Sequence, residues 1–288
     1  MKVGSSTSIR ACLLKLSQNE GLVFQQVVTR YLHERLLYRL SLSEYKYKFI
    51  LKGGNLLYAL EGLHVRPTVD IDILAKNIEN DKEILKKIFT DICNIHYDND
   101  CVYFDTSNIV VSDIAEEKKY SGIRLLIKAQ FNTIKQYLQV DIGFGDIVFP
   151  APIIISYPTL LNELSPPDIM AYSIETLIAE KFHAMTQLGL FNSRYKDFYD
   201  VYKLFLQNEI NEQALTEAIK VTFRQRETKF STNHPLFSDV FAKDPDRNLQ
   251  WHYFLKKIKH SETLTFETVM SLIKSKLQPI IENESNVI

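Results

Sequence analysis

The sequence predicts an α+β protein in which a mixed sheet with flanking helices is followed by a mainly helical C-terminal domain. Three observations predict this class. Helical and strand periodicities alternate in the first half of the chain, helical periodicity fills the second half, and a proline-containing tract lies between them. Because that tract contains Pro158, Pro166 and Pro167, we predict domains at residues 1–160 and 161–288.

The first half begins with two predicted helices. Apolar residues recur at helical spacing over 8–42, with a break near Gly21. A short apolar strand at 49–51 then runs through Gly53 and Gly54 into a third helix. The other elements predicted in this half are a helix at 81–92 and strands at 69–74, 102–104, 109–114, 123–131 and 138–142.

The second half shows almost no strand pattern. Its apolar residues recur with the period of a helix, which predicts a helical domain. The helices predicted there span 169–188, 196–207, 211–223, 248–258 and 266–277.

Composition narrows the classes of function. The chain has 288 residues, 45% of them hydrophobic, which is enough for a sizeable core. Its formal net charge of −1 lacks the basic excess of a typical nucleic-acid binder, so a polyanionic partner would need a local basic patch. Three cysteines without a CxxC pair favour a reducing compartment, and no apolar run approaches a membrane span. We therefore predict a soluble, cytoplasmic protein with no membrane partner.

Two carboxylates stand out on the strand at 69–74. Asp70 and Asp72 are two residues apart, so both lie on the same face while the apolar residues face the other way. Mg²⁺ prefers oxygen ligands and is commonly held by one or two carboxylates plus substrate phosphates. The pair therefore predicts a metal site, and the alternative is an exposed polar strand edge.

A third acid would complete a site for two Mg²⁺ ions. Asp141 is the candidate, because Leu138, Val140 and Ile142 share one side of its strand and leave Asp141 on the other. A solvated polar residue is an equally simple interpretation of Asp141. Asp146 is a second candidate, although it follows glycines and could merely shape a loop.

The glycine pair predicts a phosphate contact. Glycine lacks a Cβ, so the backbone N–H groups of Gly53 and Gly54 at a helix start can approach phosphate oxygens. Alone, such a pair more often marks only a tight turn. The signal gains weight because the two aspartates follow it closely.

Gly53-Gly54-Asn55 followed by Asp70-Ile71-Asp72 resembles the signature of the polymerase-β nucleotidyltransferase superfamily. Taken with residues 49–57 and 66–72, it is more specifically similar to the AbiEii/AbiGii toxins, the toxin halves of type IV toxin–antitoxin and phage-abortive systems. The resemblance implies a nucleotidyltransferase-like sheet. Asn55 departs from the pattern, because Ser or Thr is common at that position, although an amide can also donate to a phosphate.

The helical half carries the second part of the resemblance. Residues 174–184 are similar to the family's lysine-bearing helix, and residues 194–202 to its Arg-x-Lys-Asp-x-Tyr-Asp segment. The resemblance implies that Lys181 binds nucleotide phosphates and that Asp197 is an active-site carboxylate. The structural alternatives are a lysine paired with a nearby acid and a carboxylate in the first turn of a helix.

The implied activity is transfer of a nucleoside monophosphate from a nucleoside triphosphate to an acceptor, which for some relatives is the 3′ end of tRNA. Asp70, Asp72, Lys181 and Asp197 would be catalytic, and Asp70, Asp72 and Asp141 would hold Mg²⁺. The nucleotide would be bound by Lys52, Gly53, Gly54, Asn55 and Arg66. A cognate antitoxin is the implied protein partner. A phosphotransferase and a non-catalytic nucleotide-binding module of the same fold remain the alternatives.

Overall fold

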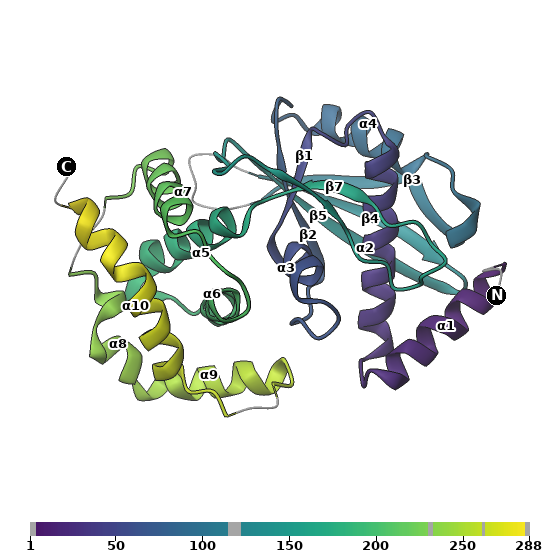
Figure 1. The fold of residues 1–288 in the computed structure, drawn as a ribbon. Coiled ribbons are helices and arrows are strands. Elements are labelled where there is room, and N and C mark those ends of the chain that lie inside the picture. Colours follow the sequence, from purple (N-terminus) through teal and green to yellow (C-terminus); the bar gives the residue numbers. More distant parts are fainter. Residues whose placement is uncertain (1–3, 115–121, 230–232, 261–262, 286–288) are drawn as a thin grey trace. The chain divides into compact units, whose positions relative to one another are not determined.

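The computed structural model describes residues 4–114, 122–229, 233–260 and 263–285. The chain divides into two compact units (Figure 1). Unit 1 comprises Met1–Gly145 and Pro152–Tyr172, and unit 2 comprises Asp146–Ala151 and Ser173–Ile288. Division into domains at residues 1–160 and 161–288, which the sequence suggests, stays a prediction.

Unit 1 is built on a seven-stranded mixed sheet with the order β3-β4-β5-β2-β1-β7-β6. The strands are β1 (Phe49–Lys52), β2 (Asp70–Ala75), β3 (Val102–Asp113), β4 (Ile123–Phe131), β5 (Ile134–Phe144), β6 (Ile153–Ser156) and β7 (Asp168–Ala171). β2 pairs antiparallel with β1 and parallel with β5, so the strand that carries the two aspartates lies inside the sheet. The predicted α+β fold with a mixed sheet is confirmed.

Unit 1 also contains helices, two of which pack against one face of this sheet. The helices are α1 (Ser6–Asn19), α2 (Phe24–Leu42), α3 (Gly53–Glu61) and α4 (Lys82–Cys93), with the 3-10 turn η1 (Asp98–Asp100) before β3. The ring of Tyr31 on α2 contacts Phe131 of β4, and Phe89 on α4 contacts Phe49 of β1. The β4 residues on this face are almost completely buried, which places the core of unit 1 between the sheet, α2 and α4.

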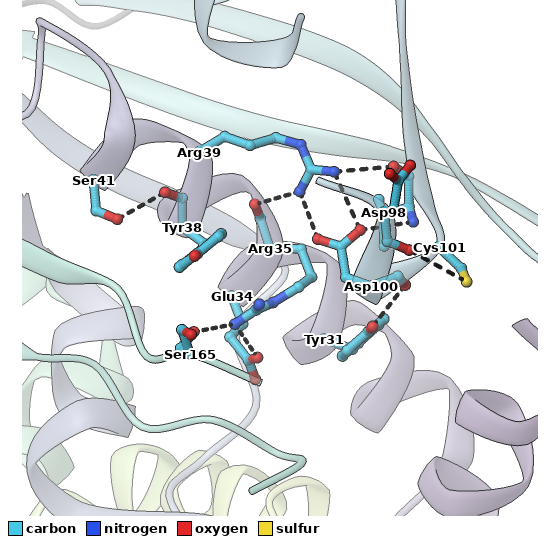
Figure 2. Close-up of polar contacts among 11 residues, drawn as sticks. Tyr31, Glu34, Arg35, Tyr38, Arg39, Ser41, Asp98, Asp100, Cys101 and Ser165 are labelled. Carbon is cyan, nitrogen blue, oxygen red and sulfur yellow. Dashed lines mark hydrogen bonds and ion pairs between the residues drawn. The ribbon is translucent and has the colours of Figure 1, made fainter. Parts of the chain in front are cut away.

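Helix α2 carries buried charges as well as apolar residues (Figure 2). Arg39 donates to both carboxylate oxygens of Asp100 in η1, at 2.7 and 3.2 Å, and both side chains are buried. The hydroxyl of Tyr31 donates to the backbone oxygen of Asp100 at 2.7 Å. On the neighbouring turn, burial raises the pKa of Glu34 to about 7, although its contact with Arg35 acts in the opposite direction. The contacts of Tyr31 and Arg39 with Asp100, and of Arg39 with the backbone oxygen of Val102, fix α2 to the start of β3.

Unit 2 is helical. Its helices are α5 (Ile174–Leu188), α6 (Tyr195–Gln207), α7 (Glu212–Gln225), α8 (Asp239–Lys243), α9 (Pro245–Lys257) and α10 (Phe266–Ser285), with 3-10 turns η2 (Gly189–Phe191) and η3 (Pro235–Phe237). Aromatic rings form its core, where Phe198 of α6 contacts Phe241 and Phe266, and Trp251 of α9 contacts Phe266. No described helix has the length and apolar character needed to cross a membrane.

Two local predictions were wrong. The helix predicted from residue 169 begins at Ile174, because Asp168–Ala171 form β7, which pairs parallel with β1. The side chain of Ser173 accepts from the backbone N–H of Thr176 and caps α5, so the helix cannot include the preceding apolar run. The two strands predicted at 102–104 and 109–114 are one strand, β3, with a register shift between Asp105 and Val110.

Candidate active site

Three carboxylates converge on the sheet of unit 1. β2 and β5 run parallel with Asp72 beside Asp141, and Asp70 lies one pleat away beside Gln139. One oxygen from each of Asp70, Asp72 and Asp141 lies within 4.8 Å of the others, and all three residues are half-buried. Oxygen ligands at this spacing suit a hard divalent cation such as Mg²⁺. Asp141, rather than Asp146, is the third member of the only such group among the described residues.

Arg124 on β4 forms a bidentate ion pair with Asp141. Its Nε and Nη2 donate to the two carboxylate oxygens at 2.8 Å each, and Gln139 donates to Asp141 at 3.1 Å. The hydrogen bonds from Arg124 to Asp141 raise the pKa of Arg124, and the charges of Asp70 and Asp72 also raise it. When the three carboxylates are ionised, Arg124 balances one of them. The two negative charges that remain would balance the two positive charges of a divalent cation.

The glycine pair packs directly against the aspartate motif. Gly53 has a φ of +65°, and a Cβ built there would lie 2.0 Å from Oδ2 of Asp72. A Cβ on Gly54 would lie 2.6 Å from the side chain of Thr68, whose hydroxyl donates to Oδ1 of Asp70 at 2.6 Å. Both glycines are therefore needed for close approach, and they bring the start of α3 against the carboxylates.

We expect Gly53→Ala to weaken divalent-cation binding by about tenfold or more, because the new methyl group must displace Asp72. Binding of Mn²⁺, followed by electron paramagnetic resonance, measures this effect. Gly62→Ala is the matched control, since Gly62 also has a positive φ of +80° but a Cβ there has no neighbour within 4 Å. Equal Mn²⁺ affinity for the two variants would contradict this account of Gly53.

The first turn of α3 presents its backbone N–H groups without a side-chain cap. The N-cap residue Lys52 makes no capping hydrogen bond through its side chain. The first N–H groups of a helix have no partner inside the helix, and the helix dipole favours an anion there. This end of α3 is therefore suited to a phosphate group.

The side chain of Asn55 is turned into unit 1. It is 1% exposed, its amide donates to the backbone oxygen of Asp70 at 2.7 Å, and its oxygen accepts from the hydroxyl of Tyr157 at 2.9 Å. His33 on α2 contacts the same oxygen through Nδ1 at 3.3 Å. In this conformation Asn55 supports the backbone of β2. A contact between its side chain and a phosphate stays a prediction.

Lys52 and Arg66 flank these motifs in unit 1. Lys52 lies beside Asp72 in the antiparallel register of β1 and β2, and its Nζ is 5.4 Å from the ring centroid of Tyr172. Arg66 is half-buried in the loop before β2. Nucleotide binding by both residues stays a prediction.

We expect His33 to make unit 1 less stable in acid. Burial lowers the pKa of His33 from 6.5 to about 4, so between these values the unfolded chain binds a proton that the folded chain does not. The free energy of unfolding should then fall by about 3 kcal/mol as the pH drops through this window. Urea unfolding at several pH values should show a shallower decline for His33→Asn, which keeps a donor near the position of Nδ1. An unchanged slope would contradict the assignment.

In unit 2, Lys181 and Asp197 belong to a buried ion network. Nζ of Lys181 on α5 lies 3.1 Å from Asp197 and 2.6 Å from Asp200, both on α6. Arg194 lies 2.6 Å from the other oxygen of Asp197. Burial alone would raise the pKa of Asp197, but the charges of Lys181 and Arg194 lower it to about 2. The catalytic roles of Lys181 and Asp197 stay predictions.

Asp146, the alternative third acid, also has a cationic partner in unit 2. Nη2 of Arg226 lies 2.9 Å from Asp146 and 3.0 Å from Glu180. Nη1 of Arg226 contacts Nδ1 of His183 at 3.2 Å. Asp146 therefore takes part in an ion network that joins the segment before α5 to the end of α7.

A mixed sheet that carries a carboxylate trio beside a glycine turn is the arrangement that the nucleotidyltransferase resemblance predicts. Residues 35–272 match the family described as "Nucleotidyl transferase AbiEii toxin, Type IV TA system". The chain belongs to this family. The resemblance drawn from the glycine and aspartate motifs is thereby confirmed.

Two solved structures share the fold. One is a suggested nucleotidyltransferase from H. pylori, with a TM-score of 0.50 and 17% identity over 93% of this chain and 99% of that chain. The other is JHP933 from Helicobacter pylori, with a TM-score of 0.50 and 17% identity over 91% of this chain and 96% of that chain. No curated protein shows a significant match to the sequence.

Proposed function

We propose that the protein is a metal-dependent nucleotidyltransferase toxin that transfers a nucleoside monophosphate from a nucleoside triphosphate to an acceptor hydroxyl. The supporting observation is that the carboxylate trio and the uncapped start of α3 meet at the contact between Gly53 and Asp72. A cation-binding group and a phosphate-binding group so placed can hold a triphosphate together.

Asp70, Asp72 and Asp141 would hold one or two Mg²⁺ ions. The bound metal would neutralise charge on the triphosphate. The N–H groups of Gly53 and Gly54 would hold a phosphate oxygen, and Arg124 would keep Asp141 oriented. On the family pattern, Lys181 would bind the nucleotide phosphates and Asp197 would be an active-site carboxylate. Lys52, Asn55 and Arg66 are the other proposed nucleotide ligands.

The reaction is a displacement at the α-phosphorus. The acceptor oxygen forms a bond to this phosphorus, and the bond from it to the bridging oxygen of the β-phosphate breaks. Pyrophosphate leaves, and the hydroxyl proton passes to solvent. The protein contributes orientation and charge neutralisation, which carry most of the catalysis in phosphoryl-group transfer.

The 3′ end of tRNA is the acceptor we propose, and a cognate antitoxin is the proposed protein partner. Membership of a type IV toxin–antitoxin family supports the antitoxin. The tRNA acceptor is proposed by analogy with some relatives. The cytoplasm, where tRNA and nucleoside triphosphates are both present, is the proposed location.

Incubation of the purified protein with total RNA and each nucleoside triphosphate in Mg²⁺ tests the proposal. Each triphosphate is supplied with the label on either its α- or its γ-phosphate. We expect one α-label to enter an RNA of tRNA size, and EDTA to prevent it. Transfer of the γ-label would instead identify a phosphotransferase, and transfer of neither label would identify a non-catalytic binding module.

A further inference from the structure

On the face of the sheet opposite to α2 and α4, called the open face below, the described side chains of β3, β4 and β5 are half-buried or exposed. On β4 the two faces differ sharply, because Ile127 and Ala129 are fully buried while the alternate residues Lys128 and Gln130 are not. Tyr103 on β3 and Tyr137 on β5 belong to the open face, and they are 62% and 57% exposed. Exposed tyrosines by themselves mean little, since Tyr is a common strand residue. These two tyrosines are informative because of where they lie relative to the carboxylate trio.

The strand register aligns the open face in four successive rows. The rows are Asp72 with Asp141 and Arg124; Asp70 with Gln139 and Leu126; Tyr137 with Lys128 and Asp105; and Lys135 with Gln130 and Tyr103. The first two rows hold the carboxylate trio. The next two present tyrosine, lysine and glutamine side chains together with Asp105, and these tyrosine rows continue directly from the candidate active site.

The spacing of the rows suits a polynucleotide. Tyr137 is four residues from Asp141 on β5, which corresponds to about 14 Å along the strand. Stacked nucleotides advance by about 3.4 Å each, so a base over Tyr137 would be roughly four stacked nucleotides from the metal site. Fewer nucleotides would cover this distance if the RNA were unstacked and extended. Tyr103 lies two strands and one row from Tyr137, about 12 Å away, so the two rings form separate platforms.

The chemistry of the rows favours a single-stranded nucleic acid over an apolar protein surface. Aromatic rings stack on bases without sequence preference, and lysines meet the backbone phosphates. Lys128 lies opposite Tyr137, is 36% exposed, and is 3.8 Å from Asp105, while Lys135 is exposed in the next row. Apart from the two tyrosine rings, the apolar side chains along these rows are Leu126 and its β3 neighbour Val110, so the described side chains of this surface are mostly polar or charged.

We propose that the open face of β3, β4 and β5 binds the last nucleotides of a single-stranded RNA acceptor and leads its 3′-hydroxyl to the carboxylate trio. Tyr137 and Tyr103 stack on bases, and Lys128 and Lys135 contact phosphates. This inference rests on the proposed nucleotidyl transfer and specifies where its acceptor lies.

Fluorescence anisotropy with the full chain and a labelled 12-nucleotide RNA of mixed sequence with a free 3′-hydroxyl tests the proposal. The titration is done in Mg²⁺ without a nucleoside triphosphate, so that no transfer occurs. We expect Tyr137→Ala to weaken binding about fivefold or more, because a stacked base is lost. Tyr137→Phe, which keeps the ring, should bind as the wild type does. Tyr47→Ala is the matched control, since Tyr47 is 58% exposed beside lysines but lies outside these rows.

Wild-type affinity in Tyr137→Ala, or no measurable binding of this RNA by the wild type, would overturn the proposal. Thermal unfolding of Tyr137→Ala separates a lost contact from a damaged fold, and Tyr103→Ala provides a second, independent variant. The α-label assay distinguishes the two levels of inference. If transfer requires Asp70 while Tyr137→Ala binds normally, the surface is wrong and the proposed function stands. If RNA binding requires Tyr137 but no label is transferred, the surface stands and the proposed function fails.

Discussion

Replacing Asp70 by Asn should reduce nucleotidyl transfer by about 10³-fold, because a metal contributes several kcal/mol of charge stabilisation and each 1.4 kcal/mol is about tenfold in rate. The substitution keeps the shape of the side chain and an oxygen that can accept from Thr68. The loss should therefore come from metal binding rather than from the fold. Incorporation of the α-label into RNA at saturating Mg²⁺ measures it.

Asp91→Asn is the matched control for this loss. Asp91 is an exposed carboxylate on α4 in the same unit, where it pairs with Lys87 at 3.0 Å. Its removal should leave transfer unchanged, since exposed ion pairs contribute little. Transfer by Asp70→Asn at the rate of Asp91→Asn would refute the assignment of Asp70.

Asp100→Ala should lower the free energy of unfolding by about 3–5 kcal/mol. Asp100 is fully buried, and its carboxylate accepts two hydrogen bonds from Arg39 and one from the backbone N–H of Val102. The substitution leaves the guanidinium of Arg39 buried without its carboxylate (Figure 2). Urea unfolding followed by circular dichroism measures the change.

Asp98→Ala provides the control for Asp100, because Asp98 lies two residues away and its side chain is 82% exposed. We expect its effect to stay within about 0.5 kcal/mol. The double substitution Arg39→Met with Asp100→Leu should be less destabilised than Asp100→Ala, since it removes both charges from the core. A double variant as unstable as Asp100→Ala would contradict the unpaired-charge explanation.

Local periodicity was enough to predict most elements of the fold, but not those that depend on distant pairing. The apolar run at 169–171 is short, and such a run fits a buried strand and a buried helix equally well. It forms β7 because Ile50 and Leu51 of β1 pair with Met170 and Ala171, a contact between residues far apart in sequence. Because the run is so short, its length alone could have suggested a strand instead of the start of a helix.

The candidate site could be predicted where it depends on strand parity, that is, on the alternation of side chains between the two faces of a strand. Parity placed Asp70 and Asp72 on one face and Asp141 on the polar face of its strand, and the parallel register of β2 and β5 brings them together. The ion pair of Arg124 with Asp141 was missed, because it depends on the antiparallel register of β4 and β5. Parity alone could have placed Arg124 on the polar face of its strand.

Burial was the least predictable property of the site. Asn55 follows the glycine pair, and nothing in the sequence showed that its side chain would be buried in contact with Tyr157 and the backbone of Asp70. The helical pattern of α2 predicted an apolar face and gave no sign that Arg39 would be buried against Asp100. Such contacts join residues that are far apart in the chain, and periodicity describes only neighbours.

The most direct test of the central claim is the anomalous scattering of Mn²⁺ in crystals of the wild-type protein soaked with a non-hydrolysable nucleoside triphosphate analogue. Mn²⁺ replaces Mg²⁺ at oxygen sites and can be located without ambiguity. We expect a peak about 2.1 Å from carboxylate oxygens of both Asp70 and Asp72, with the phosphates of the analogue at the first turn of α3. A bound analogue with no Mn²⁺ on Asp70 and Asp72 would contradict the account.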